Sequence, residues 1–117
     1  MTELELEIMN IIWDRGEVTV RQVHDALSER RAVAYTSVIT MLAVLEGQGL
    51  LEKAVGEQAY GYRAARPREE VVEEIVADFL SRVFNGSAVS LVQHLVDNGS
   101  INLDQVEEIV RAREPAE

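Results

Sequence analysis

Residues 34–51 read AYTSVITMLAVLEGQGLL and place a short helical pattern directly before a glycine-marked stop and a strand. The apolar residues at helical spacing, which are expected to face inward, are Val38, Met41, Leu42 and Leu45. The outer face then carries Thr36, Ser37, Thr40 and Ala43. Small polar side chains let a helix sit deep in a major groove and reach base edges or phosphates, so this stretch predicts a DNA-reading helix.

Two further helical patterns precede this stretch, and a hairpin follows it. Each of the two helices opens with a capping signature, at residues 2–5 and 19–22. Leu50–Val55 and Gln58–Arg63 alternate like strands around a turn at residues 56–57. Three helices followed by a two-stranded wing predict a mainly α chain that begins with a winged-helix domain.

Pro67 interrupts the secondary-structure pattern at the point where the composition of the chain also shifts, which predicts a domain boundary at residues 64–68. We therefore expect a winged-helix domain over residues 1–66 and a helical domain over residues 67–117. The second domain reads as three short amphipathic helices with more apolar surface than they can bury among themselves. The residues expected to make dimer contacts are Val72, Ile75, Phe79, Val83, Leu91, Val92 and Leu95. A second copy is the economical partner, because a two-fold dimer also matches two half-sites on a duplex.

The net charge of -10 argues against simple nucleic-acid binding, which normally requires a surplus of Lys and Arg. Its distribution weakens that objection, because residues 67–117 carry a net charge of -7 and residues 1–66 only -3. Residues 30–45 include two arginines and no acid. The candidate phosphate contacts are Arg30, Arg31, Lys53 and Arg63.

Several classes of function are not expected. Cysteine is absent, and His24 and His94 are seventy positions apart, so the sequence predicts no metal site and no cofactor. The sequence contains no constellation typical of a catalytic site, so an enzyme is not expected. No apolar run approaches ~18 residues and no signal peptide is evident, so we expect a cytoplasmic protein without membrane insertion.

Motifs along nearly the whole chain also resemble those of a known protein family. They are TELELEIM at residues 2–9 with Ile12-Trp13, TVRQV at 19–23, AYTSVITML at 34–42 with Leu45 and Gly49-Leu50, AYGYR at 59–63, and the segment 84–95. Together they resemble the penicillinase repressors, the BlaI/MecI/CopY group of bacterial winged-helix transcription factors. The resemblance implies a homodimer that represses β-lactam-resistance or related stress genes by binding an inverted repeat. Some members of this family are cleaved after a membrane sensor protease detects a β-lactam, so the resemblance also implies such a protease as a partner.

The chain departs from the family pattern at several positions. Family members usually carry a basic residue where this chain has Val44, often lysines at Gly47 and Gln48, and frequently an arginine near Gln58. Each loss removes a phosphate contact, which lowers affinity and flattens its salt dependence. The absence of cysteine sets copper sensing aside. Where the cleavable branch has an Asn-Phe bond, this chain has His94-Leu95.

The acidic balance and the missing basic residues leave a second hypothesis open. The chain could be a protein-interaction adaptor whose winged helix has reduced affinity for DNA. A binding assay at several salt concentrations separates this adaptor from a repressor, because phosphate contacts make binding salt-dependent.

Overall fold

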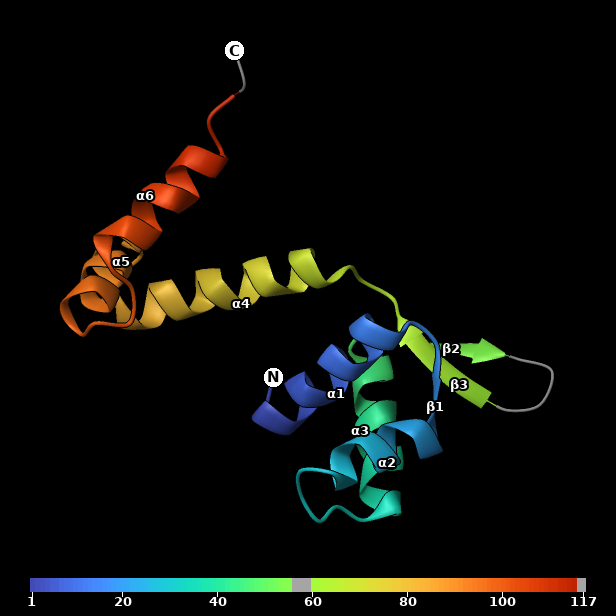
Figure 1. Ribbon diagram of the computed structural model, residues 1–117. Helices are drawn as coiled ribbons and strands as arrows, with labels where there is room; N and C mark the ends of the chain where they lie inside the picture. Colours follow the sequence, from blue (N-terminus) through green and yellow to red (C-terminus); the bar gives the residue numbers. More distant parts are fainter. Residues whose placement is uncertain (56–59, 116–117) are drawn as a thin grey trace. The chain divides into compact units, whose positions relative to one another are not determined.

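The computed structural model describes residues 1–55 and 60–115, which divide into two compact units, Met1–Val71 and Val72–Glu117 (Figure 1). The side chains of Val55 and Tyr60 lie outside this description, as do the predicted turn at residues 56–57 and Gln58. The elements are α1 (Glu3–Arg15), β1 (Val18–Thr19), α2 (Val20–Ser28), α3 (Tyr35–Gly47), β2 (Leu51–Val55), β3 (Tyr60–Ala64), α4 (Arg68–Val83), α5 (Ala88–Asp97) and α6 (Leu103–Ala112). The predicted mainly α fold with an N-terminal winged helix is confirmed.

The first helices begin at the predicted caps. Thr2 Oγ1 accepts a hydrogen bond from the amide of Glu5 at 3.1 Å. Thr19 and Gln22 form a complete capping box, in which each side chain accepts from the other residue's amide. Because such caps satisfy amides that have no partner within the helix, they fix where α1 and α2 start.

The sheet has one more strand than the sequence predicted. Its order is β1-β3-β2, and the pair Val18–Thr19 runs antiparallel to β3. The predicted two-stranded wing is present as β2 and β3, and β1 adds a strand that the sequence did not predict, because a two-residue strand is too short to show alternation. Gly61 lets β1 come this close, since a Cβ there would lie 2.7 Å from the carbonyl oxygen of Val18.

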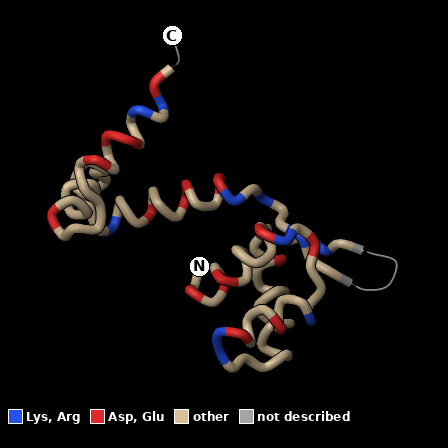
Figure 2. The backbone as a smooth tube through the Cα atoms, in the orientation of Figure 1, with Lys and Arg blue, Asp and Glu red and all other residues tan. Residues whose placement is uncertain are grey.

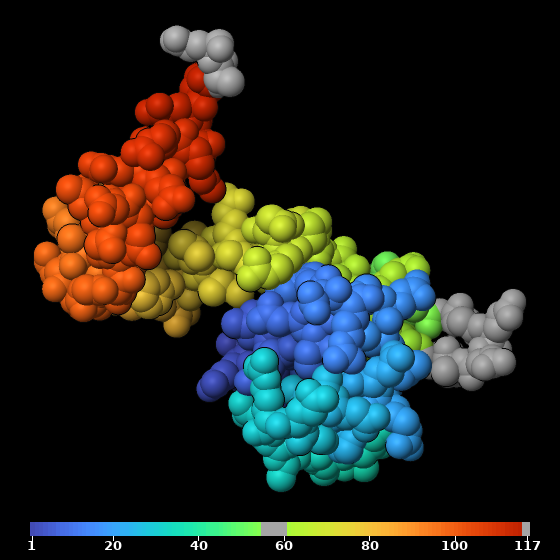
Figure 3. All heavy atoms as spheres, in the orientation of Figure 1, coloured from blue at the N-terminus to red at the C-terminus, as the bar shows by residue number. Residues whose placement is uncertain are grey.

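The hydrophobic core of the N-terminal unit is built from all of its helices and from the sheet. In the space-filling view, α1 and α2 pack closely against each other (Figure 3). The largest fully buried side chains are those of Ile8, Met9, Ile12, Val23, Leu27, Val38, Leu42, Leu45 and Leu51. Because the inner face of α3 is held by this core, the opposite face of α3 has a fixed orientation at the surface.

The first turn of α4 belongs to the N-terminal unit. Val71 is only 2% exposed and joins the core, and the indole Nε1 of Trp13 donates to the backbone oxygen of Arg66 at 3.0 Å. The compact units consequently divide after Val71, a few residues beyond the boundary expected at residues 64–68. The sequence signal marked the break at Pro67, whereas the packing of Val71 sets where the core ends.

The C-terminal unit comprises most of α4 together with α5 and α6. The turn between α4 and α5 places Asn85 and Gly86 at φ 52° and 82°. Phe84 lies between two aromatic rings, with centroids 5.8 Å from Phe79 and 6.0 Å from His94. Among the described residues of this unit, no side chain is fully buried. The unit therefore has apolar contacts but no closed core of its own.

Candidate nucleic-acid interface

The outer face of α3 carries the small side chains that the sequence predicted. Thr36, Ser37, Thr40 and Ala43 are all exposed. On the opposite face, Val38, Leu42 and Leu45 are each 0% exposed. The hydroxyl of Thr40 donates to the backbone oxygen of Thr36 at 3.1 Å, which leaves its lone pairs facing outward as acceptors. The predicted orientation of α3 is confirmed, and contact of these residues with DNA stays a prediction.

Two apolar side chains flank this small-residue face. Val44 is 43% exposed, and Ile39 is exposed to a similar degree. Val44 occupies the position at which the family pattern expects a cation, and its exposure means that a longer basic side chain there could extend into solvent. Because Val44 is exposed, its lack of charge lowers the positive charge that this part of the α3 surface offers to DNA.

The cations of the α2–α3 turn differ in their surroundings. Arg31 Nη2 donates to Glu7 Oε1 on α1 at 2.9 Å. The other carboxylate oxygen of Glu7 is buried, and no hydrogen-bond partner for it lies among the described residues. Arg31 is therefore the cation that compensates a partly buried charge, which favours keeping it against α1. Arg30 is exposed and makes no ion pair within residues 1–55 and 60–115.

The wing holds its arginine between two carboxylates. Glu52 and Arg63 are direct cross-strand partners on β2 and β3, with Arg63 Nε donating to Glu52 Oε1 at 2.7 Å. Arg63 Nη1 also donates to Glu17 Oε1 at 3.5 Å. The hydrogen bond and charge of Glu52, followed by those of Glu17, raise the pKa of Arg63 above its already high value. The guanidinium is thus always charged, but its charge is locally compensated.

Lys53 is the neighbouring wing cation. Its side chain is exposed and makes no ion pair with any described residue.

Across both units, Lys and Arg are scattered along the chain, and Asp and Glu often lie beside them (Figure 2). The predicted phosphate contacts therefore split into two kinds: Arg30 and Lys53 are open to solvent, whereas Arg31 and Arg63 are held by carboxylates.

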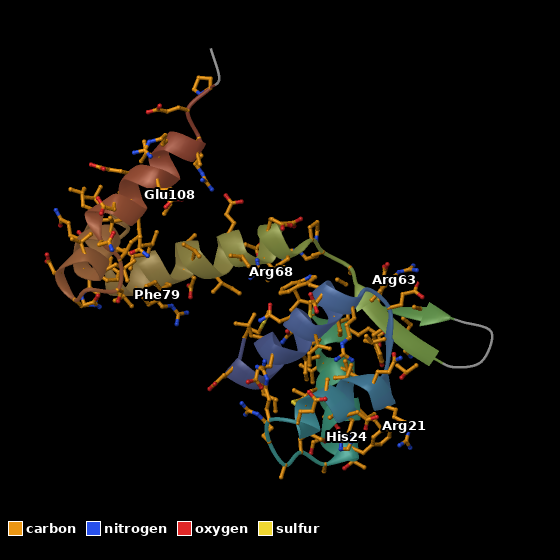
Figure 4. All side chains as sticks on the ribbon, viewed as in Figure 1. Arg21, His24, Arg63, Arg68, Phe79 and Glu108 are labelled. Atoms are coloured by element: carbon orange, nitrogen blue, oxygen red, sulfur yellow. The ribbon has the colours of Figure 1, made fainter. Side chains whose placement is uncertain are left out.

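A cluster that the sequence analysis missed lies where α2 meets the start of α3. The guanidinium carbon of Arg21 lies 5.8 Å from the ring centroid of Tyr35, and the His24 ring meets the same ring edge-on at 5.5 Å. His24 Nε2 is 2.9 Å from the backbone oxygen of Val33. Arg21 and His24 project from neighbouring positions of α2 (Figure 4). Nothing in the spacing of these residues signals the contact, because it joins two helices across a turn.

The predicted dimer residues lie on helices of the C-terminal unit, and none of them is buried within one chain. Three are half-buried, namely Val72, Leu91 and Leu95. Four are exposed, namely Ile75, Phe79, Val83 and Val92. Large apolar side chains that are exposed together on neighbouring helices often mark a protein–protein contact surface. Among the described residues, no group of three or more His, Asp or Glu side chains is placed to hold a metal ion.

Comparison with known proteins identifies the family. The family model described as penicillinase repressor matches residues 1–114. This chain belongs to the penicillinase repressor family. The transcriptional regulator BlaI of Mycobacterium tuberculosis is 35% identical over 112 residues, which cover 94% of this chain and 80% of that protein. The penicillinase repressor of Bacillus licheniformis is 24% identical over 97% of this chain and 89% of its own length.

A solved structure supports the fold independently of the family match. The oxidized form of MarR from E. coli superposes with a TM-score of 0.55 at 16% identity, over 96% of this chain and 72% of that chain. At this identity the likeness concerns the fold alone. Since the penicillinase repressors and the named relatives are transcriptional regulators, the prediction that the chain is not an enzyme is confirmed.

No single helix among the described residues is long and apolar enough to cross a membrane. Arg68–Val83 and Ala88–Asp97 meet the length and composition criteria only as a pair, and that pair is bent by 80°.

Proposed function

We propose that this member of the penicillinase repressor family is a homodimeric repressor that binds inverted-repeat operator DNA through α3. The observation that carries the proposal is the two-sided construction of α3, with Val38, Leu42 and Leu45 fully buried and an opposite face of small, hydroxyl-bearing side chains. Such a helix can approach base edges closely while the core holds its orientation. By analogy with its named relatives, its targets are β-lactam-resistance or related stress genes, and it acts in the cytoplasm, where those genes are.

Dimerisation through the C-terminal unit completes the proposal. The described part of this unit has no fully buried side chain, although Phe79, Val83 and Val92 are exposed apolar residues on its helices. Burying apolar area of this kind contributes about 25 cal/mol per Å², so a partner surface is favoured. A second copy of the chain supplies the same surface by symmetry and presents two α3 helices to two half-sites.

Release of the repressor by a membrane sensor protease would meet an obstacle at the position that matches the family's cleavage site. His94 and Leu95 lie inside α5, where His94 also contacts Phe84. Many proteases bind their substrates as extended strands, so cleavage here requires α5 to unwind locally. We propose that any proteolytic release of this chain depends on such unwinding.

The adaptor hypothesis has one specific observation in its favour. Arg31 and Arg63 are both compensated by carboxylates, and Val44 is apolar, so the surface offers few open cations to phosphates. A chain that binds proteins through this surface would show weak binding to every duplex and little dependence on salt.

Selection of duplexes from a randomised pool by the full-length protein tests the two candidates. A repressor enriches a two-fold symmetric sequence, and sedimentation of that duplex with protein gives two chains per duplex. An unenriched pool, or a complex with one chain per duplex, would contradict the proposed dimeric repressor. Binding of random and enriched duplexes with equal affinity would favour the adaptor.

A further inference from the structure

We infer that Arg21 and Tyr35 form a pair that contacts the phosphates of a DNA strand beside the start of α3. The inference rests on the proposed function and adds a contact that neither the motifs nor the family match points to. It concerns the sugar-phosphate backbone, so it contributes affinity and docking orientation and not sequence preference.

Arg21 and Tyr35 lie where a helix-turn-helix meets the DNA backbone. In a helix-turn-helix the second helix enters the major groove while the first crosses the phosphate backbone. Here α3 is the second helix and α2 the first, and Arg21 lies in the first turn of α2. Tyr35 is the first residue of α3 and directly precedes Thr36, the first residue of the proposed reading face. A cation held on Tyr35 therefore lies where a strand flanking the groove would pass.

The Arg21 side chain is preorganised by its neighbours. The Arg21 guanidinium lies 5.8 Å from the centroid of the Tyr35 ring, within the range of a cation–π contact. The ring is itself supported edge-on by His24, whose Nε2 lies 2.9 Å from the Val33 oxygen. A cation–π contact at this distance does not occupy the N–H groups of the guanidinium, so they can donate to phosphate oxygens. A long arginine side chain thus loses less freedom when a phosphate arrives.

The charge of Arg21 is available to a phosphate. Arg31 is tied to Glu7 and Arg63 to Glu52, so a phosphate has to compete with a carboxylate for either one. Arg21 is exposed and makes no ion pair with a described carboxylate. Tyr35 is 40% exposed, more than a ring needs for core packing alone. Of the arginines near α3, Arg21 is therefore both open and held in place.

Binding of Arg21→Gln to the duplex enriched by selection, and to a random duplex of equal length, tests the inference over a range of salt. We expect both affinities to fall by the same factor, roughly tenfold, because a dimer loses two exposed charge contacts. The log-log salt slope should become shallower by about two units. Arg111→Gln, which removes an equal charge from α6, should leave both affinities and the slope unchanged.

The role of the ring is tested by a double-mutant cycle. Tyr35→Leu should weaken both duplexes severalfold, Tyr35→Phe should bind almost like wild type, and Tyr35→Leu should add nothing when Arg21 is already Gln. Thermal unfolding checks that each variant is folded. If wild type binds DNA and Arg21→Gln binds equally well at every salt concentration, or if the two losses multiply, the pair is refuted while the proposed function stands. Failure of wild type to bind any duplex would overturn both.

Discussion

Replacing Glu52 by Gln should make this protein bind DNA more tightly. In the wing, Glu52 lies opposite Arg63 in the strand register and accepts from its Nε at 2.7 Å, and Glu17 accepts from the same guanidinium at 3.5 Å. A phosphate that approaches Arg63 must displace these carboxylates and also meets their negative charge. Glu52→Gln removes the negative charge from the shorter of the two contacts, and Glu17→Gln combined with Glu52→Gln removes both charges.

The expected size of the effect follows from the number of cations released. One freed Arg63 per subunit adds two phosphate contacts per dimer, and each adds about 0.9 to the log-log salt slope. The double variant should therefore show a slope steeper by up to about 1.8. Between about 50 and 200 mM salt, a fourfold change, that slope corresponds to an additional loss of affinity of about twelvefold. The gain over wild type is consequently largest at low salt, and Glu52→Gln alone should give part of it.

Fluorescence anisotropy of a labelled duplex, titrated at several salt concentrations, measures both the affinity and the slope. Glu108→Gln on α6 is the matched control, because it changes the net charge equally at a position in the C-terminal unit (Figure 4). In an Arg63→Gln background, the Glu52→Gln gain should vanish. Equal binding of the double variant and wild type at all salt concentrations would refute the account, and so would an undiminished gain without Arg63.

Three further changes probe other parts of the molecule. Val44→Arg should tighten operator binding and steepen the salt slope together, because position 44 is exposed on α3, and unchanged binding at every salt concentration would mean that this position does not face the backbone. Val71→Ala should lower the free energy of unfolding by about 2 kcal/mol in a denaturant titration, because two buried methyl groups are lost. Val89→Ala, at an exposed position, should lower it far less. Equal losses in the two variants would contradict the assignment of Val71 to the N-terminal core. Phe79→Glu, at a residue 44% exposed in one chain, should convert a sedimenting dimer to a folded monomer at micromolar concentration, and a wild-type monomer would contradict the proposed dimer.

The parts of the fold that were predictable depend on neighbours in the sequence. The capping box of Thr19 and Gln22 acts over three residues, and the helical spacing of Val38, Leu42 and Leu45 follows from one helix. These local signals gave α2 and the two faces of α3 correctly.

The parts that were missed depend on pairs far apart in the sequence. Strand β1 exists because Val18 meets Tyr62, and Arg31 is held by a carboxylate 24 positions away. From the sequence alone Arg63 reads as an open cation, yet it donates both to Glu52 on the neighbouring strand and to Glu17, which is 46 positions away. No periodicity encodes such contacts, because they arise only after the helices and strands pack together.

Whether the outer face of α3 reads DNA sequence is tested by measuring how strongly the Thr40→Ala variant prefers the enriched duplex over the random duplex. Alanine favours the helix and keeps the inner face intact, so the variant should fold. The ratio of the two affinities should fall by about fivefold or more per half-site, with unchanged random-duplex affinity and salt slope. A folded Thr40→Ala protein with the wild-type ratio would contradict the claim.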